Sequence, residues 1–183
     1  MGEQKRKVVV TGACGKIAGQ VLPFIRERYD LTLLDIRTTD GSGQEVAGVQ
    51  VVDLLDPDRD AYRQYFRGAD AVLHFGFVRA QDPRESESRF RAEFANVEMA
   101  YNVYQTAWEE RVRRVVVTSS NHAADYYERL ILEHKHDFVY PDTFALSDNF
   151  YGWAKIAYET LGFVYASGGV GDRPLEKTKP SVS

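Results

Sequence analysis

The sequence has 183 residues, enough for one domain with a sizeable apolar core. Its 44% hydrophobic and 27% charged residues are typical of a globular protein, and its net charge of −4 argues against nucleic acid as the main partner. No apolar run approaches the roughly 20 residues that cross a bilayer, and "MGEQKRKVVVTG" lacks the apolar region of a signal peptide. The single cysteine excludes an internal disulfide. We therefore expect a cytoplasmic protein without a membrane partner, a nucleic-acid partner or a bound metal.

Short apolar runs and helical patterns alternate along the chain. Runs rich in β-branched residues predict five strands, at 7–12, at 31–37, within 48–56, at 69–77 and at 114–120. Apolar residues at helical spacing predict helices at 16–28, 57–68, 83–110 and 149–166. The first of these contains Pro23, which would either lower the stability of the helix or kink it. Residues 121–148 are mixed and polar, which predicts a loop with a helical turn.

This alternation predicts the fold class. Strands that alternate with helices build a parallel sheet covered on both faces, so we expect an α/β, doubly wound architecture. The second, third and fourth strands are largely apolar, as strands covered on both faces should be. We expect one domain over 1–167 and a flexible tail over 168–183, where the composition changes to Gly, Pro, Lys and Ser.

The turn after the first predicted strand, "TGACGKIAG", has the composition of a phosphate-binding loop. Gly12 and Gly15 lie between a strand and a helix, where glycines let the backbone approach a pyrophosphate and the helix amino terminus supplies N–H groups. Ala18 is the small residue that lets the helix and the strand come close. Glycines are also common in ordinary tight turns, so the loop alone does not decide between the two interpretations.

Two aspartates at strand ends extend this hypothesis. Asp35 closes the second strand about 20 residues after the loop, where a carboxylate accepts hydrogen bonds from ribose hydroxyls. Because a carboxylate there repels a 2′-phosphate, NAD is favoured over NADP, although Lys16 and Arg37 are close enough in sequence to soften that preference. Asp53 closes the third strand, either as an adenine contact or as an ordinary loop or helix-capping aspartate.

Tyr151 and Lys155 lie four residues apart on the last predicted helix, and in a chain with 11 tyrosines this spacing alone is weak evidence. Oxidation of a secondary alcohol needs a base, and a free tyrosine with a pKa of about 10 is a poor base at neutral pH. An ammonium group one helical turn away favours the phenolate. Ser120, at the carboxyl end of the fifth strand, can hydrogen-bond the reacting oxygen. We therefore predict Tyr151 as base, Lys155 as its electrostatic partner and Ser120 as the positioning donor.

The order of these motifs resembles a known family. "TGACGKIAG", the strand-ending Asp35, "DL" at 53–54, "VLHFG", Asn96, "VVVTSSNH" and "YGWAK" together are similar to extended short-chain dehydrogenase/reductases of the NAD-dependent epimerase/dehydratase family. Within it, "SSNH" at 119–122 is most like uronate dehydrogenases. The resemblance implies a Rossmann-like sheet of about five strands in the order 3-2-1-4-5, with NAD as cofactor and a sugar or uronic acid hydroxyl as substrate. A nucleotide-sugar epimerase and a non-catalytic dinucleotide-binding module are the alternatives.

The resemblance also implies roles for individual residues. It implies cofactor contacts for Gly12, Gly15, Lys16, Ile17, Asp35, Asp53, Leu54, Phe75, Gly76, Asn96, Tyr151 and Lys155. Asn121 and His122 would contact the substrate, although His122 could equally be a loop histidine held by the backbone. Arg79 stands where uronate dehydrogenases tend to have small or hydroxyl residues, so it either pairs with a sugar carboxylate or faces solvent.

The resemblance has two consequences for assembly. Family members commonly pair through the two helices predicted here at 83–110 and 149–166, so a homodimer is expected. Family members also normally continue with further strands and a small substrate-binding domain, so we expect this sequence to be either a truncated product or a shortened member of the family. We therefore expect an exposed edge at the fifth strand and a less enclosed site.

Overall fold

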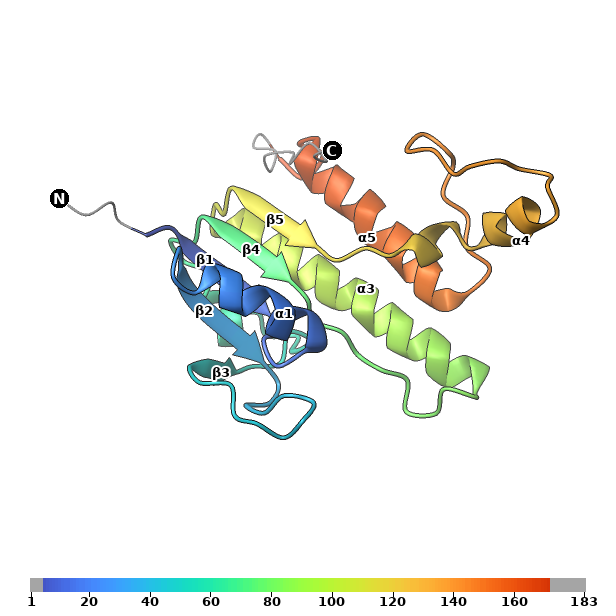
Figure 1. The fold of residues 1–183 in the computed structure, drawn as a ribbon. Helices are drawn as coiled ribbons and strands as arrows, with labels where there is room; N and C mark the ends of the chain where they lie inside the picture. The colour runs from blue at the N-terminus through green and yellow to red at the C-terminus, as the bar shows by residue number, and fades with distance from the viewer. Residues whose placement is uncertain (1–4, 172–183) are drawn as a thin grey trace.

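The computed structural model describes residues 5–171, and a five-stranded parallel sheet forms its centre (Figure 1). The strand order is β3-β2-β1-β4-β5, which confirms both the predicted order and the doubly wound α/β class. The strands are β1 (Lys7–Thr11), β2 (Asp30–Asp35), β3 (Val49–Val51), β4 (Ala71–His74) and β5 (Arg114–Val117). β4 and β5 end earlier than predicted because the ladder between them stops at the pair formed by His74 and Val117.

The helices between and after the strands follow the predicted order along the chain. They are α1 (Lys16–Ile25), α2 (Asp60–Arg63), α3 (Ser86–Glu109), a 3-10 turn η1 (Asn121–Ala124), α4 (Tyr126–Leu132) and α5 (Phe150–Ala166). The predicted helix at 57–68 was wrong in length, because only one turn forms. Asp56 and Asp58 each accept a hydrogen bond from the backbone N–H two residues ahead, and such local turns compete with a helix.

The two faces of the sheet bury separate sets of side chains. Val9 points to the face that α2 and α3 cover, where it belongs to the same cluster as Phe66. Val8 and Val10 point to the opposite face, where they belong to the same cluster as Leu22 of α1. Because successive side chains of a strand alternate between faces, the single run of valines in β1 supplies both cores and makes β1 the central strand.

Close packing between α3 and α5 fixes where the last helix lies. The hydroxyl of Tyr104 on α3 donates a hydrogen bond to the carbonyl of Tyr158 on α5, at 3.2 Å. A Cβ added at Gly162 would lie 2.6 Å from that same hydroxyl, so only glycine allows this approach without a shift. The contact sets the position of α5 along α3, and with it the position of Lys155.

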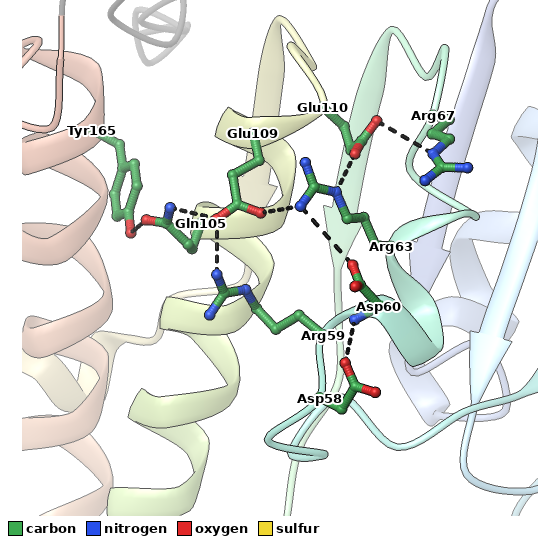
Figure 2. A network of polar contacts seen from close by, with 9 residues as sticks. All are labelled: Asp58, Arg59, Asp60, Arg63, Arg67, Gln105, Glu109, Glu110 and Tyr165. Carbon is green, nitrogen blue, oxygen red and sulfur yellow. Dashed lines mark hydrogen bonds and ion pairs between the residues drawn. The ribbon is translucent and has the colours of Figure 1, made fainter.

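A polar network ties α2 and α5 to the carboxyl end of α3 (Figure 2). Arg59 and Arg63 both pair with Glu109, at 2.8 and 3.1 Å. Gln105 donates to the same carboxylate at 2.7 Å and accepts a hydrogen bond from the Tyr165 hydroxyl at 2.8 Å. Burial alone would raise the pKa of Glu109, but Gln105 and the arginines outweigh it and hold that pKa below its ordinary value. Because the network joins three helices far from the carboxyl ends of the strands, its role is structural.

A groove of about 380 Å³ lies on the α1 face of the sheet, at the amino ends of β1, β4 and β5. Its floor contains Val8, Ala71 and Leu73, and its rim includes Arg6 and Asp70. Ligands of open α/β sheets bind at the carboxyl ends of the strands. The groove is therefore at the wrong end of the sheet for the predicted chemistry.

The carboxyl-terminal part of the chain is described only as far as residue 171. Residues 168–171 form a turn against α5, in which Gly169 N donates to the Val164 carbonyl at 3.0 Å. The rest of the predicted flexible tail, 172–183, lies outside the described residues. Across 5–171, no helix has both the length and the apolar character that a membrane crossing requires, and no three potential metal ligands cluster.

Candidate functional site

Gly12 brings the loop after β1 against the loop after β4. Its φ of +67° is left-handed, and a Cβ there would lie 2.6 Å from the backbone N of Gly76. Gly15 N donates to the Gly12 carbonyl at 2.9 Å, and Gly15 begins α1 without a side-chain cap. Lys16 and Ile17, the first residues of α1, are exposed beside this loop. The first N–H groups of the helix are thus left for a ligand with negative charge.

Asp35 ties this loop to the end of β2. Its Oδ2 accepts a hydrogen bond from Cys14 N at 2.9 Å, and its Oδ1 accepts one from Arg37 N at 3.3 Å. Each carboxylate oxygen has a further lone pair, so the same side chain can still accept bonds from ribose hydroxyls. Burial raises the pKa of the Cys14 thiol, and the Asp35 charge adds to the shift. Cys14 therefore serves as a small packed side chain rather than as a nucleophile.

A buried polar pair lies directly behind the loop, and the sequence did not mark it. The Thr11 hydroxyl and His74 Nδ1 are 2.7 Å apart, on the adjacent strands β1 and β4. Burial, and to a lesser extent the positive charge of Lys155, lowers the pKa of His74 to about 4. The ring is consequently neutral at neutral pH, so the pair supports the loop without adding charge.

Lys155 is the most deeply placed charged group of the site, with 5% of its surface exposed. Its Nζ donates a hydrogen bond to the Thr118 carbonyl, at 3.1 Å. The ammonium lies 4.5 Å from the ring centroid of Tyr158 and 5.2 Å from that of Tyr151. Burial lowers the pKa of Lys155, and the Glu93 carboxylate opposes that shift. Ring faces and a carbonyl thus replace the water that a buried ammonium would lose.

Tyr151 lies where three segments meet. Its ring contacts Phe77 of the loop after β4 edge-on, with centroids 5.8 Å apart. It contacts His122 of η1, after β5, with centroids 5.3 Å apart. Phe77 directly follows Gly76 in the sequence, and Gly76 packs against Gly12 of the glycine loop. The structure therefore brings the predicted Tyr151 and Lys155 to the same ends of the strands as the glycine loop.

Ser120 begins η1 as its N-cap. Its Oγ accepts a hydrogen bond from His122 N and donates one to Asn121 Oδ1, each at 3.3 Å. Ser120 is thus linked to Tyr151 through His122, and the Asn121 side chain is exposed beside it. The three predicted residues at 120–122 all lie at the beginning of the 3-10 turn that follows β5. Their roles toward a substrate stay predictions.

Asn96 holds the loop after β4 in place. Its Oδ1 accepts from Val78 N at 2.7 Å, and its Nδ2 donates to the Val78 carbonyl at 2.9 Å and to Glu93 at 3.2 Å. Burial raises the pKa of Glu93, a carboxylate that the sequence did not mark. Arg79, directly after the clamped Val78, is exposed to solvent. Asn96 therefore positions the segment that carries Phe77, and a direct cofactor contact stays a prediction.

Two residues predicted at the adenine have structural contacts of their own. Asp53 accepts a hydrogen bond from Leu55 N at 2.9 Å, which is the loop-aspartate alternative. Leu54 is buried in the core beneath α3, and its carbonyl accepts from Asn102 at 2.9 Å. An adenine contact at these positions stays a prediction, in which the backbone rather than the Leu54 side chain would take part.

Asn149 and Asp125 are the other site residues that sequence reasoning missed. Asn149 caps α5, because its Oδ1 accepts from Gly152 N at 2.9 Å. An asparagine at the beginning of a helix is a known capping signal, and Asn149 is the first residue of the predicted helix at 149–166, so its role could have been found. Asp125 accepts hydrogen bonds from both His122 and Asn149. Asp125 and Asn149 are 24 positions apart in the sequence, so no local pattern indicates their contact.

Comparison with known proteins agrees with this geometry. The model of the NAD dependent epimerase/dehydratase family matches residues 8–171. The chain belongs to this family. The match covers both the glycine loop and the helix with Tyr151 and Lys155, so the predicted resemblance is confirmed at the level of the family.

Several known proteins are similar to most of this chain. Uronate dehydrogenase from Pseudomonas syringae is 32% identical over 161 residues, which cover 87% of this chain and 54% of that protein. A solved mutated uronate dehydrogenase aligns with a TM-score of 0.69 and 26% identity, over 90% of this chain and 55% of that one. A short-chain dehydrogenase/reductase superfamily protein from Agrobacterium tumefaciens, solved with bound NAD, aligns with a TM-score of 0.66 and 27% identity, over 88% and 46%. This chain spans about half the length of these relatives.

The residues of the glycine loop fit the nucleotide that the family description implies. Gly12 has a left-handed backbone and no Cβ, so the turn after β1 packs directly against the backbone of Phe75 and Gly76. The uncapped amino end of α1 presents N–H donors to an anion. Asp35 keeps acceptor capacity for hydroxyl groups while its two oxygens shape the loop. Donors for the phosphates and an acceptor for the ribose therefore lie on adjacent strand ends.

We predict that Gly12→Ala lowers both the free energy of unfolding and the affinity for NAD more than Gly68→Ala does. Both glycines are left-handed, with φ of +67° and +69°, but a Cβ at Gly68 meets nothing within 4 Å. Gly68→Ala should therefore cost only the conformational strain, about 1–2 kcal/mol. Gly12→Ala adds a clash with the backbone of Gly76 and should lose NAD binding as well. Urea unfolding and NAD titration of both variants test this, and equal effects on stability and binding would contradict it.

Proposed function

We propose that this chain binds NAD at the carboxyl ends of its strands and uses it to oxidise a hydroxyl group of a sugar or uronic acid. The observation that carries the proposal is the convergence of Tyr151 and the buried Lys155 with the turn that begins at Ser120. NAD, when bound, would supply the hydride acceptor. The similarity to uronate dehydrogenases supports the substrate class.

The residues that would hold NAD follow from the geometry of the loop. Gly12 and Gly15 would admit the pyrophosphate to the amino end of α1, which carries partial positive charge. Asp35 would accept hydrogen bonds from the adenosine ribose, which favours NAD over NADP. Lys155 would hold the second ribose with its ammonium, the group that already binds the Thr118 carbonyl.

The proposed proton chemistry uses three side chains. Tyr151, as the phenolate, would take the proton of the substrate hydroxyl and become a neutral phenol, and the positive charge of the Lys155 ammonium would favour the phenolate before that transfer. Ser120 would donate a hydrogen bond to the reacting oxygen. Its present bonds, to Asn121 and from His122 at 3.3 Å each, are long enough to be exchanged for one to a substrate.

Two other functions share much of this geometry. The family description includes epimerases, which would use the same residues while retaining NADH within each cycle. A dinucleotide-binding module without turnover is the second alternative, and it is motivated by the chain spanning about half the length of its relatives. Release of NADH separates the dehydrogenase from both.

We predict that Tyr151→Phe abolishes NAD reduction but leaves NAD binding intact. Loss of a general base costs about 10²–10⁴-fold in rate, whereas the phenyl ring keeps the contacts with Phe77 and His122. The measurement is NADH formation with a panel of uronates and aldoses, together with NAD affinity. Tyr140→Phe is the control, since Tyr140 is exposed on the loop before α5.

Each other outcome of this experiment points to a different function. NADH formation that survives Tyr151→Phe would contradict the role of Tyr151. Sugar epimerisation without release of NADH would favour the epimerase. Saturable NAD binding without turnover of any sugar would leave the binding module as the function.

We also propose that the chain forms a homodimer through α3 and α5. Aromatic side chains on these helices stay exposed although they contact one another: Phe90 stacks on Trp153 at 5.9 Å and lies 6.0 Å from Phe94. Two adjacent helices with such a face can pair with a second copy around a two-fold axis. Each copy would then bury the aromatic face of the other.

We predict that Phe94→Glu gives a monomer in analytical ultracentrifugation. A buried charge without a partner is strongly unfavourable in an interface. Phe24→Glu is the matched control, because Phe24 is more exposed but lies on α1, on the opposite face of the sheet. A wild-type chain that sediments as a monomer would contradict the proposal, as would dissociation by Phe24→Glu alone.

A further inference from the structure

Asp125 joins two segments that flank the site. It follows η1, and one oxygen of its carboxylate, Oδ2, accepts hydrogen bonds from both sides. His122 Nδ1 lies 2.5 Å from this oxygen, and Asn149 Nδ2 donates to it at 2.8 Å. The Asp125 side chain is 17% exposed, whereas the His122 side chain is 51% exposed. The carboxylate is therefore the inner member of the pair and the imidazole the outer one.

The same contact reaches the beginning of α5. Asn149, held by Asp125, caps that helix through Gly152 N. A Cβ at Gly152 would lie 2.0 Å from the carbonyl oxygen of His122, so η1 and the first turn of α5 are in direct backbone contact. Tyr151 is the second residue of α5. A single carboxylate thus sets the position of His122 relative to Tyr151 from both segments.

The contact with Asp125 also determines which nitrogen of His122 carries the proton. An ionised carboxylate has only acceptor sites, so Nδ1 must be the donor in this hydrogen bond. In a neutral imidazole the other nitrogen, Nε2, is then an acceptor. The His122 ring lies 5.3 Å from the ring of Tyr151, at 71° to it. The ring that carries this acceptor nitrogen therefore lies beside the predicted base.

We propose that Asp125 is a positioning residue that fixes the Nδ1–H form of His122, so that Nε2 accepts a hydrogen bond from a substrate hydroxyl next to the one that Tyr151 oxidises. The substrate role rests on the proposed function, whereas the positioning of His122 does not. A hydroxyl group can donate this bond and an ionised carboxylate cannot. The selected substrate is therefore a polyhydroxylated carbon chain or ring, with two adjacent hydroxyl groups at the reacting end.

The first experiment tests the positioning on the free protein. Nitrogen-15 NMR of labelled histidine reports which ring nitrogen is protonated, and His122→Gln identifies the signal. We expect the Nδ1–H form in the wild type at a pH where the imidazole is neutral, and loss of that preference in Asp125→Ala. Asp125→Asn retains an acceptor oxygen, so it should keep the Nδ1–H form. That result would show that the change in the alanine variant comes from the lost acceptor and not from misfolding.

Asp148→Ala is a matched control for this experiment. Asp148 also accepts a hydrogen bond from Asn149 Nδ2, at 3.1 Å, but it is exposed and has its bond to Asn149 rather than to His122. Both alanine variants remove one carboxylate from the cap of α5. Asp148→Ala should leave the His122 signal unchanged. An Nε2–H form in the wild type, or the same change in both alanine variants, would overturn the proposal.

The second experiment tests the substrate role. With a sugar substrate, Asp125→Ala and His122→Gln should each raise KM about tenfold, the loss expected for one hydrogen bond, and the double variant should lose no more than either. With a deoxy analogue that lacks the adjacent hydroxyl, the variants and the wild type should have the same KM. Equal losses on both substrates would overturn the substrate role. Absence of turnover in the wild type would defeat the proposed function and this role together, while the NMR result would still decide the positioning.

Discussion

The approach of Gly12 to the backbone of Phe75 and Gly76 is the constraint on which the site depends. A Cβ at Gly12 would lie 2.6 Å from Gly76 N and 2.7 Å from the Phe75 carbonyl oxygen. Because the two loops meet here, the end of β1 and the end of β4 are held at one fixed separation. Behind them the Thr11–His74 hydrogen bond joins the same two strands. The glycine loop is therefore held rigidly at the carboxyl ends of the strands.

The second half of the site depends on how a buried ammonium is kept in place. Lys155 has the Thr118 carbonyl and the Tyr151 and Tyr158 rings around its Nζ, with Glu93 opposing the effect of burial on its pKa. These groups come from β5's carboxyl end, α5 and α3. The position of Lys155 thus depends on the packing of three elements against one another. Of these, α5 is held in place by its contacts with α3.

The sequence was informative wherever the relevant signal was local. The alternation of strand and helix patterns predicted the parallel sheet, and the glycine spacing after β1 together with the acid at the end of β2 predicted the position of a nucleotide loop. The Tyr151–Lys155 spacing acquired meaning only from the strand and serine that precede it. Fold class, strand order and family were all confirmed, whereas the roles of individual site residues stay predictions.

What the sequence could not show depends on contacts between distant segments. His74 looked like part of an apolar strand, although it faces Thr11 on the neighbouring strand. Glu93 lies on a helix where a carboxylate is usually exposed, yet the packing of α3 buries it. Asp125 lies within the polar stretch 121–148, which was predicted only as a loop with a helical turn. The shortened α2 was missed for another reason, since Asx turns at Asp56 and Asp58 have no periodicity.

Calorimetric titration of the wild-type chain with NAD and with NADP tests the central claim most directly, because it measures the nucleotide site independently of turnover, substrate and assembly. We expect saturable binding of NAD at one site per chain, tighter than that of NADP, since the Asp35 carboxylate repels a 2′-phosphate. Absence of measurable heat or saturation with either nucleotide would contradict it.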